Sequence, residues 1–483
     1  MKTSMIIIKK LKNLLILLFL LFLKSGNCAK NMIDIIIENT QPIKIKESRR
    51  LPLFVWVSIP LNVTEEELKL YLNQLLERNI VVFTKWYIPK EGIESGIKEA
   101  IKIDKIKKDL NFPVAIDATS IVYRFFDGSQ ETGHIDEEGK VFFDMSFLPT
   151  VKMGCPFKIE KRYDVIKERL EKFLKAYKDE GIEIKYWVVD WEIDGPIEWN
   201  SAWSNSKKCI ICRKNIKDIE NFDEFQKVIR KKRADLQREV FVDTIKKYFP
   251  NCLTGNYAVN PHDGYRYWWD YFEKEVEGAT YQKEHNALYR KWFDEFKYSG
   301  YTIAMPVIYT WYRFFNDYNF EEKEYRWFYP LLKEATSVGK NTSENIPIIS
   351  FIHWQTVEKP KQLPSDFVPL SREKYKELLW HLLFRRFDTF CLWSPLNEIA
   401  EEIKVLHEVY SESFKYNDFI LKGEPIFWEV PEKSGSVISG LKLKNKLLII
   451  RSDFGKKEII KIKVGNKQIE IPIISGPFIL DIK

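Results

Sequence analysis

Two acidic residues at the end of an apolar segment are the clearest candidates for chemistry. Residues 186–192 read YWVVDWE, so the segment ends in Asp190 and Glu192. Side chains alternate along a strand, which places both carboxylates on one face with Cα atoms about 6.5 Å apart. Trp187 and Trp191 then face the helix layer. Two carboxylates in a partly apolar pocket cannot both ionise freely, so one keeps a proton at neutral pH and serves as an acid.

Eight short apolar runs are expected to form the strands that position these carboxylates. Amphipathic segments separate the runs between residues 50 and 415, a pattern typical of parallel strands connected by covering helices. The sequence therefore predicts an α/β fold, a TIM-like (β/α) barrel, in which catalytic residues collect at the carboxyl ends of the strands. The expected strands are 53–59, 80–86, 114–116, 186–191, 252–257, 301–309, 346–351 and 389–393. The clearest helical segments are 64–78, 160–180, 222–248 and 372–386.

The last part of the chain has a different pattern. After about residue 417 helical periodicity stops, and short runs alternate apolar and polar residues between Gly and Asn punctuation. The runs are 425–430, 435–441, 446–451, 458–464 and 468–474. This pattern predicts a small antiparallel β-sandwich over residues 418–483, to which we assign a structural role.

Residues 1–29 read as an export signal. Basic residues precede an apolar run at 14–23, which is too short to span a bilayer but has the length of a signal core. Cleavage after Ala29 is one outcome, lipidation of Cys28 a second, and an uncleaved anchor a third. We therefore expect a secreted, cell-surface or periplasmic protein that meets a membrane only through such a lipid or signal anchor.

Composition and cysteine spacing limit the remaining options. The 76 basic residues nearly match 69 acidic ones, so the net charge of +7 is no nucleic-acid signature. The 15% aromatic content suits either a sugar-binding cleft or a large core, and we expect a monomer. Cys209 and Cys212 form a CxxC pair without a second pair or a His-x-His at zinc spacing. We therefore predict a local bridge or free thiols there, no metal ligand and no cofactor.

Four segments in order resemble glycoside hydrolase family 56, the hyaluronidases. The acidic motif itself, with Pro196, Trp199 and Asn200 after it, resembles the family's Asp-aromatic-Glu strand end. The other three segments are residues 255–261 (GNYAVNP), 305–309 (MPVIY) and 390–393 (FCLW). The chain departs from the family at residues 193–195, where a Trp-Arg pair is usual, and in its C-terminal module. Family 18 chitinases also end a strand in Asp-Trp-Glu, but they need acidic residues where this chain has Lys185 and Val188.

The resemblance implies a set of roles for named residues. Glu192 would protonate the leaving oxygen and later activate water, while the substrate's own N-acetyl oxygen attacks the anomeric carbon. Asp190 would orient and stabilise the oxazolinium that forms, helped by a hydrogen bond from Tyr309. Tyr257 would contact the acetamido group or the carboxylates, and Trp393 would form the apolar floor. The expected partner is a polysaccharide that contains N-acetylhexosamine.

Two other interpretations remain open from the sequence. The chain is alternatively a non-catalytic glycan-binding surface protein on a barrel scaffold, because fold does not dictate activity. A third interpretation keeps the enzyme but gives it a protein nucleophile from a later strand, such as Glu398. Asp117, His262 and Asp194 are further candidates near the barrel mouth, with structural roles favoured for the first two.

Overall fold

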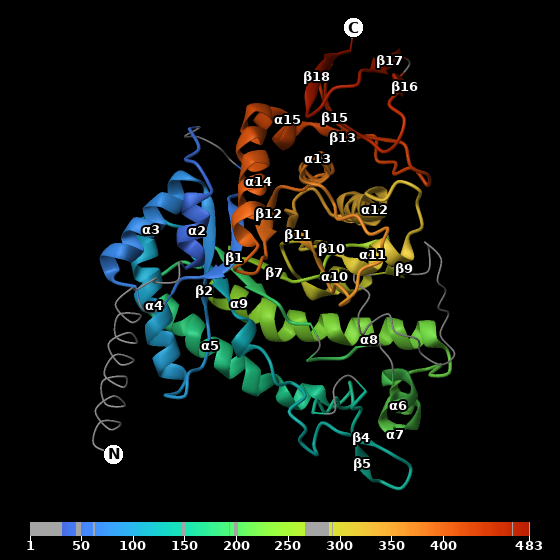
Figure 1. Cartoon of the computed structure of the whole chain (residues 1–483). Coiled ribbons are helices and arrows are strands. Elements are labelled where there is room, and N and C mark those ends of the chain that lie inside the picture. The colour runs from blue at the N-terminus through green and yellow to red at the C-terminus, as the bar shows by residue number, and fades with distance from the viewer. Residues whose placement is uncertain are drawn as a thin grey trace, which may run out of the picture.

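The structure is a computed structural model of the chain, shown in Figure 1. It describes residues 31–44, 50–60, 63–146, 150–192, 194–197, 201–265, 289–291, 293–465 and 467–482. The predicted export signal and Cys28 therefore lie outside the described residues. Among the helices that are described, none combines the length and the apolar character that crossing a membrane requires.

A curled sheet of eight parallel strands forms the centre of the molecule. Its order is β10-β11-β12-β1-β2-β3-β6-β7. The bounds are β1 Leu53–Ser58, β2 Ile80–Lys85, β3 Ala115–Asp117, β6 Tyr186–Val189, β7 Leu253–Asn256, β10 Val307–Trp311, β11 Ile349–Val357 and β12 Thr389–Leu392. Thr302 and Ile303, which precede β10, donate backbone hydrogen bonds of 2.9 and 3.0 Å to the carbonyl of Thr254 in β7. The two ends of the sheet thus meet, and the predicted TIM-like barrel is confirmed.

Helices cover the outside of the sheet, as Figure 1 shows. They are α2 Met32–Glu38, α3 Glu65–Glu77, α4 Ile93–Asp109, α5 Tyr163–Asp179, α8 Phe222–Leu236, α9 Asp243–Tyr248, α10 Phe293–Ser299, α11 Tyr312–Asp317, α12 Tyr325–Asn341, α13 Arg372–Leu383 and α14 Ile399–Glu412. At the start of α3, Thr64 and Glu67 form a reciprocal capping box. The predicted helix 222–248 is instead α8, a π-helical stretch Gln237–Val242, and α9.

Two antiparallel sheets follow the barrel, as the sequence predicts. One contains β13 Glu424–Ile426, β14 Ser436–Leu443, β15 Lys446–Asp453 and β18 Phe478–Asp481, and the other β16 Ile460–Val464 and β17 Lys467–Ile471. The short helix α15 Asn417–Lys422 leads into them. His381 and Arg385 are both fully buried. Arg385 donates a hydrogen bond to the hydroxyl of Ser439 in β14, and the same hydroxyl is hydrogen-bonded to Nδ1 of His381, so polar contacts join these sheets to the barrel.

Two barrel connections form a second, smaller apolar core that the sequence did not indicate. The connection after β3 contains β4 His134–Ile135 and β5 Val141–Phe142, and the one after β6 contains α6 Ala202–Lys208 and α7 Ile210–Asn215. Both helices contact β4, at the lower edge of Figure 1. A further pair, β8 Asp263–Tyr265 and β9 Tyr289–Lys291, lies in the connection after β7.

Candidate functional site

The five residues predicted for the site line one cavity of about 240 Å³. We call this cavity the acid pocket. Tyr309 lies in β10, whereas the other four follow the carboxyl ends of β6, β7 and β12. The described residues that line the acid pocket are Trp56, Asp190, Glu192, Tyr257, Tyr309, Trp311, Phe351, Val357 and Trp393. Side chains separated by about 200 residues in sequence therefore meet at the mouth of the barrel.

Tyr123 and Thr119 hold the backbone that carries the two acids. The Tyr123 hydroxyl donates to the carbonyl of Asp190 at 3.0 Å and accepts from the N–H of Glu192 at 3.1 Å. The Thr119 hydroxyl accepts from the N–H of Asp190 at 2.9 Å. Both residues come from the connection after β3, so that connection fixes the chain where β6 ends.

Trp191 anchors the motif in the core on the side away from the acid pocket. Its ring is fully buried, and Arg233 of α8 stacks on it at 4.4 Å while donating to its carbonyl at 2.9 Å. The backbone N–H of Trp191 donates a hydrogen bond to Oδ1 of Asn256 in β7 at 3.0 Å. Gly195 packs so closely that an added Cβ would lie 2.3 Å from the Trp191 ring. The prediction that Trp187 and Trp191 face the helices is confirmed, since both contact Phe241 of the π-helical stretch.

Burial of the Asp190 carboxyl group disfavours its ionised form. Burial raises the pKa of Asp190 to about 6, a hydrogen bond with the Glu192 side chain lowers it in part, and the charge of Asp117 raises it further. The Oδ1 atom of Asp190 is buried and accepts no hydrogen bond among the described residues. Asp190 therefore keeps its proton to a higher pH than an ordinary aspartic acid does, which is the direction of shift that acid catalysis at a carboxyl pair requires.

Aromatic rings form the opposite walls of the acid pocket. Tyr309 stacks on Trp393 with ring centroids 5.7 Å apart and an angle of 23°. Tyr257 meets Phe351 edge to face at 5.2 Å. Trp393 is 38% exposed, whereas Tyr309 is 4% exposed, so the indole lies at the opening and the phenol lies deeper. Such flat apolar surfaces beside acids suit the faces of a pyranose ring.

Several residues of this region were not predicted from the sequence. Trp56, Trp311, Phe351 and Val357 also line the acid pocket, and all four belong to β1, β10 or β11. Phe351 ends a predicted strand and Trp56 lies within one, which was a usable signal, whereas Trp311 and Val357 lie beyond the predicted ends of their strands. Tyr123 gave no such signal, because it lies in an irregular connection.

The other candidates are placed outside the acid pocket. Asp117 is buried, accepts from the N–H of Thr119 at 3.0 Å, and affects Asp190 only through its charge. His262 lies 3.5 Å from the buried carboxylate of Glu334. Glu398 lies 3.5 Å from Nε2 of His353 and does not line the pocket.

Asp194 joins two loops rather than lining the pocket. Its carboxylate accepts from the backbone N–H groups of Phe125 and Phe126 at 2.8 and 3.1 Å. Trp199 and Asn200, which carry part of the family resemblance, lie outside the described residues.

A larger cavity of about 780 Å³ opens on the same side of the barrel. Ser58 and Lys85, at the carboxyl ends of β1 and β2, line it together with Arg124 and Arg169. Tyr123 lines this larger cavity too, and its hydroxyl reaches the backbone of both acids. The larger cavity therefore borders the residue that holds the backbone of the acids, and its lining contains the basic residues named above together with Glu99.

The residues suited to hold a metal lie elsewhere. Of the described residues, His134, Cys155, Cys209 and Cys212 bring their ligand atoms within 4.8 Å of one another. The prediction of no metal ligand is not supported, because it rested on the lack of a second CxxC or a His-x-His at zinc spacing from Cys209. His134 and Cys155 come from the connection after β3, so only the fold brings them near.

Comparison with known proteins gives fold similarities only. No protein-family model matches the chain, and neither does any curated protein. One similar solved structure is the bee venom hyaluronidase, with TM-score 0.34 and 14% identity, over 70% of this chain and 99% of that one. Another is a β-galactosidase from Halorubrum lacusprofundi, with TM-score 0.47 and 10% identity, over 77% and 61%.

A third similar structure is the α-L-fucosidase isoenzyme 2 from Paenibacillus thiaminolyticus, with TM-score 0.43 and 8% identity, over 78% of this chain. The match covers 51% of the fucosidase, so this chain spans about half to three fifths of the length of the fucosidase and the galactosidase. Similarities at this level do not identify a family or an activity.

Proposed function

We propose that the protein is an exported glycoside hydrolase that cleaves a polysaccharide containing N-acetylhexosamine. In this proposal it is hyaluronidase-like and uses substrate-assisted retaining hydrolysis. Glu192 is the acid, Asp190 and Tyr309 stabilise the intermediate, and Tyr257 and Trp393 hold the sugar. The substrate class rests on the family resemblance of the sequence, and the choice of mechanism rests on the geometry of the acid pocket.

Asp190 and Glu192 line the same cavity and lie within hydrogen-bonding reach of each other, and this placement is the observation that carries the mechanism. Glycosidases with two catalytic carboxylates keep them about 5–5.5 Å apart when retaining and about 6.5–9.5 Å apart when inverting, one on each face of the sugar. In this proposal, the two neighbouring carboxyl groups of Asp190 and Glu192 therefore lie on one side of the substrate. Among the described residues that line the acid pocket, no other carries a carboxylate. The substrate's acetamido oxygen is then the available nucleophile.

In this proposal each group has a distinct part in the reaction. A proton shared within the carboxyl pair belongs on Glu192 when Asp190 is ionised, so Glu192 can protonate the glycosidic oxygen. The Oδ1 atom of Asp190 has no hydrogen-bond partner within the part of the chain that the structure describes. The Asp190 carboxylate can therefore accept the N–H of the acetamido group and stabilise positive charge on the oxazolinium ring. The Tyr309 hydroxyl donates to the acetamido oxygen from the opposite wall. Glu192, now ionised, then activates the water that opens the ring.

The surroundings support a long and anionic substrate. The larger cavity provides space for sugar units beyond the one held in the acid pocket. Of the described residues that line that space, Lys85, Arg124 and Arg169 are basic and Glu99 is acidic, so basic groups predominate and favour acidic sugars. Export would bring the enzyme to a polysaccharide outside the cell, and no nucleic acid or second subunit has a part in this proposal.

The test compares three forms of the chain on a panel of N-acetylated and non-acetylated polysaccharides, by release of reducing ends. Wild-type protein is expected to cleave an N-acetylated member, and Glu192→Gln to lose at least about a thousandfold in kcat. Glu401→Gln, at an exposed position of α14, is the matched control and should retain activity. Tight binding of the panel with no cleavage by wild type would instead favour the non-catalytic alternative.

A further inference from the structure

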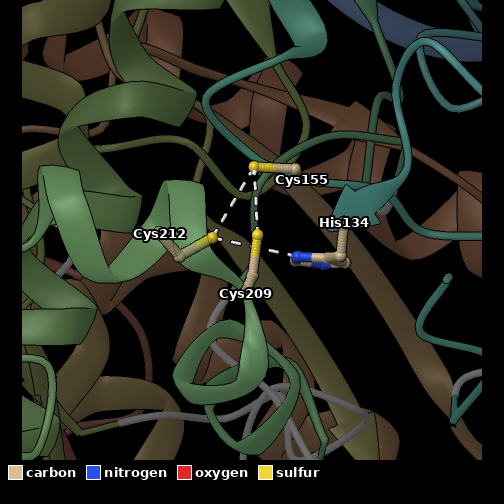
Figure 2. Close-up of side chains that lie close together, drawn as sticks. All are labelled: His134, Cys155, Cys209 and Cys212. Atoms are coloured by element: carbon tan, nitrogen blue, oxygen red, sulfur yellow. Dashed lines mark hydrogen bonds between the residues drawn. The ribbon is translucent and has the colours of Figure 1, made fainter. Parts of the chain in front are cut away.

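Four potential metal ligands converge in the small apolar core beside the barrel. Figure 2 shows the side chains of His134, Cys155, Cys209 and Cys212 pointing toward one another. We call them the Cys3His cluster. The three cysteines are fully buried and His134 is 3% exposed, so every ligand atom is removed from bulk water. The acid pocket contains none of them.

We propose that the Cys3His cluster binds one zinc ion in a closed, structural site. Tetrahedral zinc with Zn–S bonds of about 2.3 Å and Zn–N bonds of about 2.0 Å places its sulfurs about 3.8 Å apart and sulfur and nitrogen about 3.5 Å apart. The Sγ atom of Cys155 lies 3.6 Å from that of Cys212 and 4.0 Å from that of Cys209. Cys212 Sγ lies 3.8 Å from Nδ1 of His134. The ligands are therefore already spaced for zinc.

A disulfide explains this arrangement less well. A disulfide joins two sulfurs at about 2.0 Å, and the two sulfur distances here are 3.6 and 4.0 Å. Three cysteines also leave one unpaired, whereas Cys3His is a complete zinc ligand set. Thiolate ligands select zinc over magnesium or calcium, and four protein ligands leave no open position for substrate or water. The site is thus structural and does not take part in the hydrolysis.

Zinc there would fasten two separate barrel connections. His134 begins β4 and Cys155 follows β5, both in the connection after β3, whereas Cys209 and Cys212 flank the start of α7 in the connection after β6. The ring of His134 stacks on Phe142 of β5 at 5.1 Å, which fixes its orientation. The same two connections carry Tyr123 and Glu192, which are hydrogen-bonded. Zinc would therefore stabilise the part of the fold that positions the acids.

The cluster explains why a small core can persist outside the barrel. The apolar residues of this small core include Trp203, Phe225 and Ile229. By the usual scaling of core size, such a core is too small to form a stable unit alone. Small units of this kind commonly depend on a metal or on disulfides. Binding requires deprotonated thiols, so zinc affinity should fall as the pH is lowered.

The first experiment measures zinc in the full chain, expressed with added zinc and purified without chelators, by inductively coupled plasma mass spectrometry. The expected result is about one zinc per chain for wild type. Cys155→Ser and Cys212→Ser should lose it, whereas Cys252→Ser and Cys391→Ser, buried cysteines outside the cluster, should retain it. Less than about a tenth of an equivalent in wild type, before and after reconstitution of the reduced protein with zinc, would overturn the proposal.

A second measurement on wild type alone covers the case in which the cluster variants fail to fold. Replacement of zinc by cobalt(II) should give the intense visible bands of a tetrahedral thiolate site, and peptide mapping should find all three cluster cysteines as thiols. A chelator should lower the unfolding temperature of wild type. A disulfide between two cluster cysteines in the purified protein, or cobalt bands typical of octahedral oxygen ligands, would each contradict the proposal.

Discussion

The hydroxyl of Tyr123 offers a test of how the acids are positioned. It donates one hydrogen bond to the carbonyl of Asp190 and accepts one from the N–H of Glu192. Tyr123→Phe removes both. Each such bond contributes about 0.5–1.5 kcal/mol, so the free energy of unfolding should fall by about 2 kcal/mol. Misplacement of a catalytic group by about 1 Å can cost about a hundredfold in rate. We therefore expect kcat to fall about 10- to 100-fold with little change in KM.

Tyr177 provides a matched control for Tyr123. Its hydroxyl also donates one hydrogen bond, to Asp104 at 2.7 Å, and accepts one, from Nε1 of Trp86 at 3.0 Å. It lies between helices and lines neither cavity. Tyr177→Phe should therefore lose similar stability in urea unfolding but keep wild-type kcat on the substrate found in the panel. If Tyr123→Phe also kept kcat within twofold of wild type, the hydroxyl would have no positioning role.

Three further changes test separate parts of the account. The pKa of Asp190 is about 6 in the folded protein against an ordinary 3.8, so the folded state binds the extra proton more tightly and stability falls as pH rises through this window. Relative to Asp190→Asn, wild type should lose about 2 kcal/mol of unfolding free energy between about pH 4.5 and about pH 7.5 in urea titrations, and an unchanged difference would contradict the assignment. Trp393→Ala should raise KM about tenfold in steady-state kinetics, whereas Trp393→Phe should keep most of the affinity. If both variants had the KM of wild type, the indole would have no part in binding the sugar. Gly195→Ala should destabilise the protein by about 1–3 kcal/mol in thermal or urea unfolding, because its Cβ would meet the Trp191 ring at 2.3 Å, whereas Gly435→Ala, with nothing closer than 3.9 Å, should not.

The strands of the barrel were predictable because burial on both faces gives continuous apolar runs. All eight predicted strands exist, with ends that differ by a few residues, since hydrophobic pattern does not locate the last ladder hydrogen bond. The strand predicted at 301–309 begins later, at Val307, because the first part of that segment hydrogen-bonds to β7 instead, and the strand predicted at 346–351 extends further, to Val357. The alternating runs of the C-terminal sheets were equally readable, although β18 was missed.

That the five site residues lie in one pocket was predictable from one rule of barrel architecture and from the family resemblance. The carboxyl ends of parallel strands meet at one end of a barrel, so residues after β6, β7 and β12 had to lie near one another. Their chemical roles do not follow from position alone. The π-helical stretch Gln237–Val242 was not predicted, because its pattern differs little from that of an α-helix. It places Gln237 where Asn256 can donate to it at 2.9 Å, behind Trp191.

The contacts made by the connections after β3 and β6 could not be predicted from sequence patterns. Tyr123 and the Cys3His cluster lie in irregular or very short elements, and their partners are 54 to 78 residues away in sequence. A CxxC pair indicates zinc only when its second ligand pair is recognised. Here that pair is a histidine and a cysteine on another loop, which only the folded chain brings close.

A crystal structure of the Glu192→Gln chain with a bound N-acetylated oligosaccharide would test the central claim most directly. We predict a sugar in the acid pocket against Trp393, its glycosidic oxygen within about 3.2 Å of the side chain at position 192. The acetamido oxygen should lie within about 3.5 Å of the anomeric carbon. An oligosaccharide bound only in the larger cavity, or with its acetamido group turned away from Asp190, would contradict the proposed mechanism.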